Sequence, residues 1–373
     1  MKVVAAIDSF KGSMTSMEAG NAVKKGILAA KPDAEVWLSP LADGGEGTVD
    51  ALIEGLGAEK IPVTVAGPLG EKVSCYYGFL EETKTAVMEM ASAAGITLVI
   101  KKDPLRASTY GVGEMIADAL KRGCKNFMIG IGGSATNDGG IGMLKALGFE
   151  FFDEDGNDVG EGAAALAKIE VIRTENKNSL LSGAKFQIAC DVKNPLCGKQ
   201  GATYIFGPQK GVTEEQKSKV DEAMKHYADV TKESLGCDFA DCEGAGAAGG
   251  LGYAFLSYLA GELIPGVELI LQATGLEEKM KNADVVVTGE GRLDAQTVMG
   301  KAPAGVAALA KKYNAKVIAF AGSVAPEAKV CNRAGIDAFF PIVRGVTTLE
   351  EAMKKENAME NIAATAEQVF RLL

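Results

Sequence analysis

The chain has 373 residues, of which 47% are hydrophobic, and this is enough to form the packed cores of two domains. Its 39 basic against 49 acidic residues leave a formal charge of -10, which excludes the basic field that nucleic acid or an anionic membrane surface requires. No run approaches the roughly 18 uncharged apolar residues of a membrane helix. The seven cysteines are odd in number and include no CxxC pair, so we expect a soluble cytoplasmic protein with reduced thiols.

Short aliphatic runs along the chain predict buried parallel strands. Six such runs lie at Val3–Ile7, Val36–Leu38, Phe127–Ile131, Val285–Thr288, Val317–Ala321 and Ala338–Ile342. Between them lie helical patterns such as 15–30, where Thr15 and Glu18 have the spacing of a capping box. This alternation of strand and helix predicts an α/β fold with a Rossmann-like, doubly wound parallel sheet of about six strands.

Two stretches depart from this alternation of strand and helix, and they predict a second domain. Alternating short runs occupy 61–94, and strands mix with a polar helix in 149–244. The polar helix is predicted to begin at Thr213, which has capping-box spacing to Gln216. We therefore expect an inserted mixed-sheet α/β domain built from these two stretches. The Rossmann-like domain then comprises 1–60, 95–148 and 245–373.

Polar loops follow the first two predicted strands, where an open α/β sheet places its ligands. In the run DSFKGS, Asp8 and Ser9 precede Lys11, and a lysine so close to a helix N-terminus predicts a bound anion. In the run DGGEGT, Asp43 is a candidate to bind a metal or a substrate hydroxyl. An ordinary polar loop and simple helix capping are the respective structural alternatives.

Two glycine-rich segments satisfy loose dinucleotide-binding patterns. The first, GIGGSATNDGG at 130–140, follows a strand and predicts a site for phosphate or hydroxyl oxygens. Its candidate binding residues are Ser134, Thr136, Asn137 and Asp138. The second, GAGAAGGLG at 244–252, has no convincing strand before it. Its Gly246 and Gly249 either let a nucleotide phosphate approach the backbone or allow tight helix packing.

The segment ACDVKNPLCG at 189–198 carries the candidate general base. Asp191 follows an apolar run and lies near Asn194, a candidate substrate ligand. The chain has one histidine, His226, on the polar helix, so the base must come from a carboxylate or a lysine. A strand-end turn is the structural alternative for Asp191.

The segment TGEGRLDAQT at 288–297 carries Glu290, Arg292 and Asp294 directly after a buried strand. Together with Lys301 a few residues on, the motif combines two carboxylates, an arginine and a lysine, which are the charges that phosphoryl transfer uses. Glu290 and Asp294 are the candidate metal ligands. A salt-bridged loop is the structural alternative. Neither a Walker A pattern nor a protein-kinase catalytic loop occurs in the sequence.

In their order and spacing, these six motifs resemble those of the type I glycerate kinase family over essentially the whole chain. The resemblance implies ATP-dependent phosphorylation of a hydroxyl of D-glycerate, with ATP and Mg²⁺ as the cofactors. Lys11 and Arg292 would then balance the anionic groups, and Asp191 would accept or orient the substrate hydroxyl. Glu290 or Asp294 would hold the metal or its waters.

An NAD(P)-dependent oxidoreductase acting on a small hydroxy acid is the alternative function, based on the two glycine patterns. The acid-rich loop with Arg292 has no task in hydride transfer, so the kinase is favoured. A third possibility, a non-catalytic binding protein, leaves carboxylates facing an anionic ligand without a role.

Overall fold

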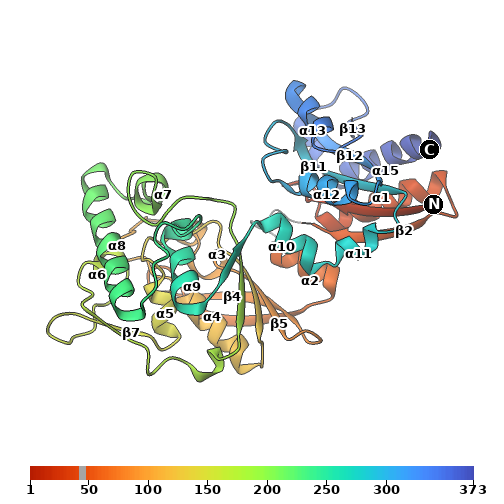
Figure 1. The fold of residues 1–373 in the computed structure, drawn as a ribbon. Coiled ribbons are helices and arrows are strands. Elements are labelled where there is room, and N and C mark those ends of the chain that lie inside the picture. Colours follow the sequence, from red (N-terminus) through yellow and green to blue (C-terminus); the bar gives the residue numbers. More distant parts are fainter. Residues whose placement is uncertain (42–47) are drawn as a thin grey trace. The chain divides into compact units, whose positions relative to one another are not determined.

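The computed structural model describes residues 1–41 and 48–373, and Asp43 therefore lies outside the described residues. The chain forms two compact units. The first comprises Met1–Asp43, Asp50–Gly57 and Val267–Leu373, and the second comprises Gly44–Val49 and Ala58–Gly266. Figure 1 shows that both ends of the chain belong to the first unit.

A parallel sheet forms the centre of the first unit. Within the described residues it has five strands in the order β13-β12-β11-β1-β2. Their bounds are β1 Lys2–Ile7, β2 Glu35–Pro40, β11 Val285–Leu293, β12 Lys316–Val324 and β13 Ala338–Pro341. β1 is buried from Val3 to Ile7, and burial on both faces explains why its sequence is a continuous aliphatic run.

Helices pack against this sheet. α1 begins after the predicted capping box, in which the Thr15 hydroxyl accepts from Glu18 N at 3.2 Å and the Glu18 carboxylate accepts from Thr15 N at 2.9 Å. Its buried residues form one hydrophobic cluster with those of α15 and of β1 and β11. The helices that lie wholly or mostly in this unit are α1 Ser16–Ala30, α2 Thr48–Leu56, α10 Gly266–Ala273, α11 Leu276–Met280, α12 Ala302–Lys311, η4 Pro326–Lys329, α13 Val330–Arg333, α14 Leu349–Met353 and α15 Lys355–Arg371.

A mixed sheet forms the centre of the second unit. Within the described residues it has six strands in the order β10-β9-β6-β5-β4-β3. β3, β4 and β5 pair antiparallel, whereas β5, β6, β9 and β10 pair parallel. The strands of this unit, including the separate β7–β8 hairpin, are β3 Glu59–Ala66, β4 Lys72–Leu80, β5 Thr85–Glu89, β6 Asn126–Gly130, β7 Glu150–Phe152, β8 Val171–Arg173, β9 Lys185–Ala189 and β10 Glu262–Ile264.

The helices of the second unit include the predicted polar helix, α8, which begins after a second capping box at Thr213 and Gln216. Its bounds and those of the other helices are α3 Ala91–Ala94, η1 Ile96–Leu98, α4 Tyr110–Lys121, α5 Ile141–Ala146, α6 Ala163–Leu166, η2 Ser179–Leu181, α7 Ala202–Lys210, α8 Glu214–Leu235, η3 Ala247–Gly249 and α9 Leu251–Leu259.

The structure divides the chain differently from the predicted domains. The run Phe127–Ile131 contains β6, which pairs with β5 and β9 in the second sheet, so the parallel sheet has five described strands and not six. The second unit accordingly takes in 95–148 and runs continuously through Ala58–Gly266, instead of being inserted twice at 61–94 and 149–244. The physical reason is that a short apolar run indicates burial of a strand but does not indicate its partners.

No helix in the described ranges combines the length and apolarity needed to cross a membrane. All seven cysteines lie in those ranges, and each is a free thiol.

Candidate active site

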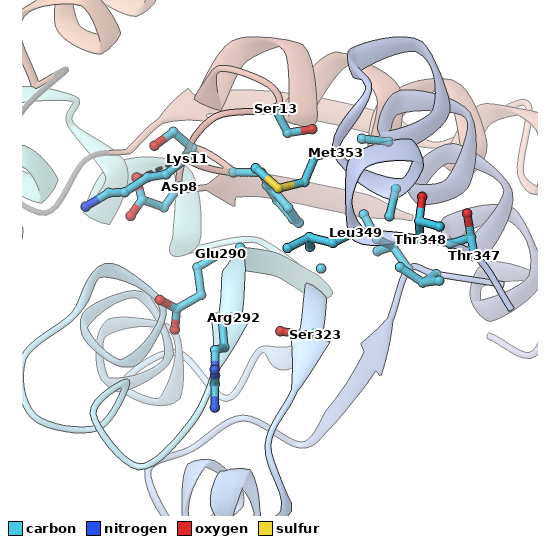
Figure 2. Close-up of a pocket in the computed structure, with 18 of the residues that line it drawn as sticks. Asp8, Lys11, Ser13, Glu290, Arg292, Ser323, Thr347, Thr348, Leu349 and Met353 are labelled. Carbon is cyan, nitrogen blue, oxygen red and sulfur yellow. Dashed lines mark hydrogen bonds between the residues drawn. The ribbon is translucent and has the colours of Figure 1, made fainter. Parts of the chain in front are cut away.

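A pocket of about 550 Å³ in the first unit lies at the carboxyl ends of β1 and β11 (Figure 2). From β1 the chain proceeds to β2 on one side, while β11 to β13 lie on the other side, so the strand order reverses between β1 and β11. Open α/β sheets bind ligands at such a reversal. The pocket is lined by residues from 8–13, 290–301, 322–323 and 342–358.

The loop after β1 places Asp8 beside the end of β11, next to Gly289 and Glu290. Asp8 N donates to Gly289 O at 2.9 Å, and one Asp8 carboxylate oxygen accepts from Ser9 N at 2.7 Å. Asp8 is buried, whereas Lys11 on the same loop is exposed and lines the pocket. The loop thus presents an acidic side chain, Asp8, and a basic side chain, Lys11, to the same pocket.

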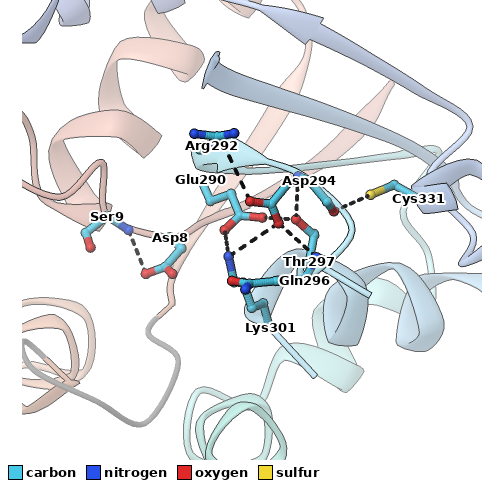
Figure 3. A network of polar contacts seen from close by, with 9 residues as sticks. All are labelled: Asp8, Ser9, Glu290, Arg292, Asp294, Gln296, Thr297, Lys301 and Cys331. Atoms are coloured by element: carbon cyan, nitrogen blue, oxygen red, sulfur yellow. Dashed lines mark hydrogen bonds and ion pairs between the residues drawn. The ribbon is translucent and has the colours of Figure 1, made fainter. Parts of the chain in front are cut away.

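Glu290 is the centre of a polar network at the charged end of the pocket (Figure 3). Thr297 Oγ1 donates to Glu290 Oε1 at 2.6 Å, and Lys301 Nζ lies 3.4 Å from Oε2. Burial raises the pKa of Glu290, while the hydrogen bond from Thr297 and the charge of Lys301 oppose this rise. A carboxylate whose pKa is raised in this way accepts a proton more readily than an exposed one.

Asp294 joins the same network. Its Oδ1 lies 3.9 Å from Lys301 Nζ, and its Oδ2 lies 3.7 Å from Arg292 Nε. The Arg292 side chain is 67% exposed, which leaves most of its donors open to a ligand. Lys11, Arg292 and Lys301 therefore bring three cations to one pocket, a set suited to several phosphate oxygens.

In the second unit, the loop after β6 carries a carboxylate that is fully buried. Asp138 Oδ2 accepts from Thr109 N and Thr109 Oγ1, both at 2.8 Å, and Oδ1 accepts from Gly140 N at 3.1 Å. Burial raises the pKa of Asp138, and these hydrogen bonds oppose the rise. Asp138 therefore joins this loop to the start of α4.

A fully buried lysine anchors the same loop. Lys210 Nζ, at the end of α7, donates to Thr136 O at 2.7 Å, and Asn137 Nδ2 donates to Thr203 Oγ1 at 3.0 Å. Burial lowers the pKa of Lys210 to about 7, although the nearby Asp138 carboxylate opposes this shift. The loop is thus held from both sides by α4 and α7.

The loop after β9 begins at the same sheet edge, because Gly130 of β6 and Ala189 of β9 are register partners. On this loop Asp191 is exposed, and its Oδ1 accepts from Gly266 N at 2.9 Å. Asn194 Nδ2 donates to Gln200 O at 2.7 Å. The parallel pairing of β6 and β9 therefore brings the two predicted motifs of this unit to one edge.

Comparison with known proteins identifies the family. The family model described as "Glycerate kinase family" matches residues 3–373. The chain belongs to the glycerate kinase family. A glycerate kinase of Bacillus subtilis (strain 168) is 45% identical over 371 residues, covering 99% of this chain and 97% of the relative. A glycerate 2-kinase of Escherichia coli (strain K12) is 45% identical over 372 residues, covering 98% of each.

A solved structure agrees with this assignment. A crystal structure from Salmonella typhimurium LT2, provisionally assigned as a glycerate kinase 2, superimposes with a TM-score of 0.91 at 43% sequence identity. The match covers 99% of this chain and 97% of that chain. The mixed α/β fold with one parallel and one mixed sheet is therefore shared with a member of the glycerate kinase family.

The predicted site residues of this glycerate kinase family member fall into two groups. In the first unit, Asp8, Ser9, Lys11, Glu290 and Arg292 line the pocket, and Asp294 joins their network. In the second unit the predicted residues lie on the loops after β6 and β9; they are Ser134, Thr136, Asn137, Asp138, Asp191 and Asn194. The prediction for Asp43 falls outside the described residues.

The glycine-rich segment 244–252 has a packing explanation that needs no ligand. Gly249 has a φ of +69°, and a Cβ on it would lie 2.1 Å from Thr136 O. A Cβ on Gly246 would lie 2.2 Å from Pro195 O. Close backbone contact therefore accounts for both glycines, and their contact with a nucleotide stays a prediction.

Two polar residues of these networks, Thr297 and Lys210, were not singled out by the prediction, and Lys301 was predicted only as one of the charges that follow the buried strand. Lys301 and Thr297 stand in the sequence close to Glu290, but spacing alone does not show that they turn back toward its carboxylate. Lys210 ends α7, whose sequence contains Gly207 and Pro208, and no signal in the sequence marks it as buried.

Replacing the buried lysine, as Lys210→Met, should flatten the pH dependence of stability. Between about pH 7 and its unfolded value near 10.5, Lys210 binds a proton in the unfolded chain but not in the folded protein, so the free energy of unfolding rises with pH in this window. The thermal midpoint of the wild type should therefore rise relative to that of the variant above about pH 7. Circular dichroism melts at several pH values measure this difference.

The matched control is Lys219→Met, which removes an exposed lysine from α8. Its thermal midpoint should stay parallel to that of the wild type over the same pH range. If the thermal midpoint of Lys210→Met also stayed parallel to that of the wild type, Lys210 would not bind a proton on unfolding in this pH range.

Proposed function

We propose that this protein is an ATP-dependent glycerate kinase, which transfers the terminal phosphoryl group of ATP to a hydroxyl of D-glycerate. Family membership supports the kinase class. The observation that carries the proposal is the pocket in which Lys11, Arg292 and Lys301 lie beside Asp8 and Glu290. Catalysis of phosphoryl transfer is mostly positioning and charge stabilisation, and this set of charges can supply both.

We also infer that the first unit is a Rossmann-like nucleotide-binding domain. Its sheet is parallel, and its pocket opens where the strand order reverses, as in other nucleotide-binding α/β sheets. The free thiols of all seven cysteines support a reducing compartment, which we infer to be the cytoplasm.

Mg²⁺ is the metal that the proposed reaction implies, and the carboxylates of the pocket fit it. Among the described residues there is no cluster of three or more histidines, cysteines or acids that could hold a metal. Mg²⁺ in phosphotransferases needs only one or two carboxylates, since phosphates and water complete its shell. Glu290 and Asp294 would hold it or its waters, and bound Mg²⁺ would neutralise charge on the transferred phosphoryl group.

Asp191 is the proposed general base of the second unit. Its carboxylate is exposed at a sheet edge, and Gly266 N orients one of its oxygens. It would accept the proton of the glycerate hydroxyl as that oxygen attacks the terminal phosphorus and ADP leaves. Asn194, Ser134, Thr136 and Asn137 are proposed to bind oxygens of the substrates.

The decisive assay incubates the purified protein with ATP, Mg²⁺ and a panel of small hydroxy acids. We expect ADP to form with D-glycerate, to require Mg²⁺ and to be independent of NAD. Chromatography quantifies ADP, and phosphorus NMR reads which hydroxyl carries the phosphate. Reduction of NAD by a hydroxy acid without release of ADP would instead support the oxidoreductase interpretation.

A further inference from the structure

The pocket of the first unit has two chemically different halves (Figure 2). One half is charged and is formed by the loop after β1 and the end of β11. The other half is apolar and lies between that loop and α14. The apolar half is lined by Phe10, Ile342, Leu349, Ala352 and Met353.

The apolar half has a buried floor and an exposed wall. Phe10 and Ile342 form the floor, being only 4% and 3% exposed. Leu349 and Met353 form the wall, and they remain 76% and 36% exposed. Because these two residues are four positions apart on α14, they project from the same face of that helix.

The wall is held in place by local contacts. The Thr348 hydroxyl accepts from Glu351 N at 3.2 Å and caps α14. The end of the Met353 side chain lies against the loop after β1, with Cε only 3.0 Å from where a Cβ on Gly12 would be. The two exposed apolar residues thus belong to a formed pocket and are not a loose surface segment.

A polar atom without a partner lies in the same lining. Ser13 Oγ is buried and forms no hydrogen bond with any part of the chain that the structure describes. Buried hydroxyls normally have a partner, and a ligand atom in the pocket that donates or accepts a hydrogen bond would supply one. The apolar half therefore favours a largely apolar group that carries heteroatoms.

We propose that the apolar half, formed by Phe10, Ile342, Leu349 and Met353, binds the purine base of ATP. This inference rests on the proposed kinase function. D-Glycerate has no apolar surface that such a wall would cover, whereas a purine nucleotide has both an apolar base and a chain of phosphates. With the base against Leu349 and Met353, the phosphates extend toward Lys11, Arg292 and Lys301 at the charged half.

The test compares two single substitutions of exposed apolar residues, Leu349→Ser and Val346→Ser. Val346 is 110% exposed and lies just before α14, but it does not line this pocket. Neither side chain is buried, so both variants should fold and melt like the wild type. Isothermal titration measures the affinity of each full-length protein for ADP and, separately, for inorganic tripolyphosphate.

Leu349→Ser should weaken ADP binding by about tenfold, because an aliphatic contact with the base is lost. Its affinity for tripolyphosphate should equal that of the wild type, and Val346→Ser should match the wild type with both probes. Unchanged ADP affinity in Leu349→Ser would overturn the proposal, as would an equal loss for ADP and tripolyphosphate. Absence of phosphoglycerate formation by the wild type would instead refute the kinase function, independently of these affinities.

Discussion

Asp191→Asn should lower kcat for glycerate phosphorylation by about 100- to 10,000-fold, because an amide cannot accept the proton of the substrate hydroxyl. The amide oxygen can still accept from Gly266 N, which lies 2.9 Å from Asp191 Oδ1, so the variant should fold normally and bind ATP. The single histidine, His226, lies on α8 with its Nε2 hydrogen-bonded to Ile169 O at 2.8 Å, and not on the loop that carries Asp191. Steady-state rates at saturating D-glycerate measure the effect.

The control for this experiment is Asp241→Asn, which neutralises another exposed aspartate of the second unit. It should leave kcat near the wild-type value. If Asp191→Asn retained most of the wild-type rate, Asp191 would not be the base, and Asp43 and Asp294 would be the next carboxylates to replace. Asp138 is a weaker candidate, because its two carboxylate oxygens are already hydrogen-bonded in a fully buried position.

Lys11→Ala should lower kcat by about 100- to 1,000-fold while leaving the thermal midpoint nearly unchanged. Lys11 lines the charged half of the pocket, where we propose that its ammonium group stabilises charge on the phosphates during transfer. Its side chain is exposed, so its removal takes little packing from the core. Steady-state kinetics and a thermal melt of the same preparation measure the two quantities.

A matched control is Lys25→Ala, which removes an exposed lysine of α1 in the same unit. Its turnover should be that of the wild type. Near-normal turnover of Lys11→Ala would mean that the loop Asp8–Ser13 is an ordinary polar connection between β1 and α1.

Local sequence signals predicted the helix starts and the strands of the first unit well. The capping boxes at Thr15 and Thr213 act within one turn of helix, so the spacing of two residues determines them. The aliphatic run that forms β1 is likewise recognisable by itself, because burial on both faces requires such a run. Partner choice is different: nothing in the run containing β6 indicates β5 and β9 as its neighbours.

The candidate site illustrates the same limit. The sequence predicted chemistry at Asp8 and at Glu290, but only the parallel pairing of β1 with β11 brings these distant residues to one pocket. The apolar half of the pocket was not predicted at all. Its wall comes from Leu349 and Met353, which belong to a short helix that carries no chemical motif.

What the sequence alone determined is the family, the absence of a strongly basic surface, and most strands and helices, because these follow from composition and from neighbours along the chain. The tertiary structure decided which strands share a sheet and which charged groups are desolvated by burial. Asp138 and Lys210 have shifted pKa values only because folding buries them, and Glu290 meets Lys301 only because the loop after β11 turns back. Desolvation and long-range pairing depend on residues far apart in the chain, and no local pattern encodes them.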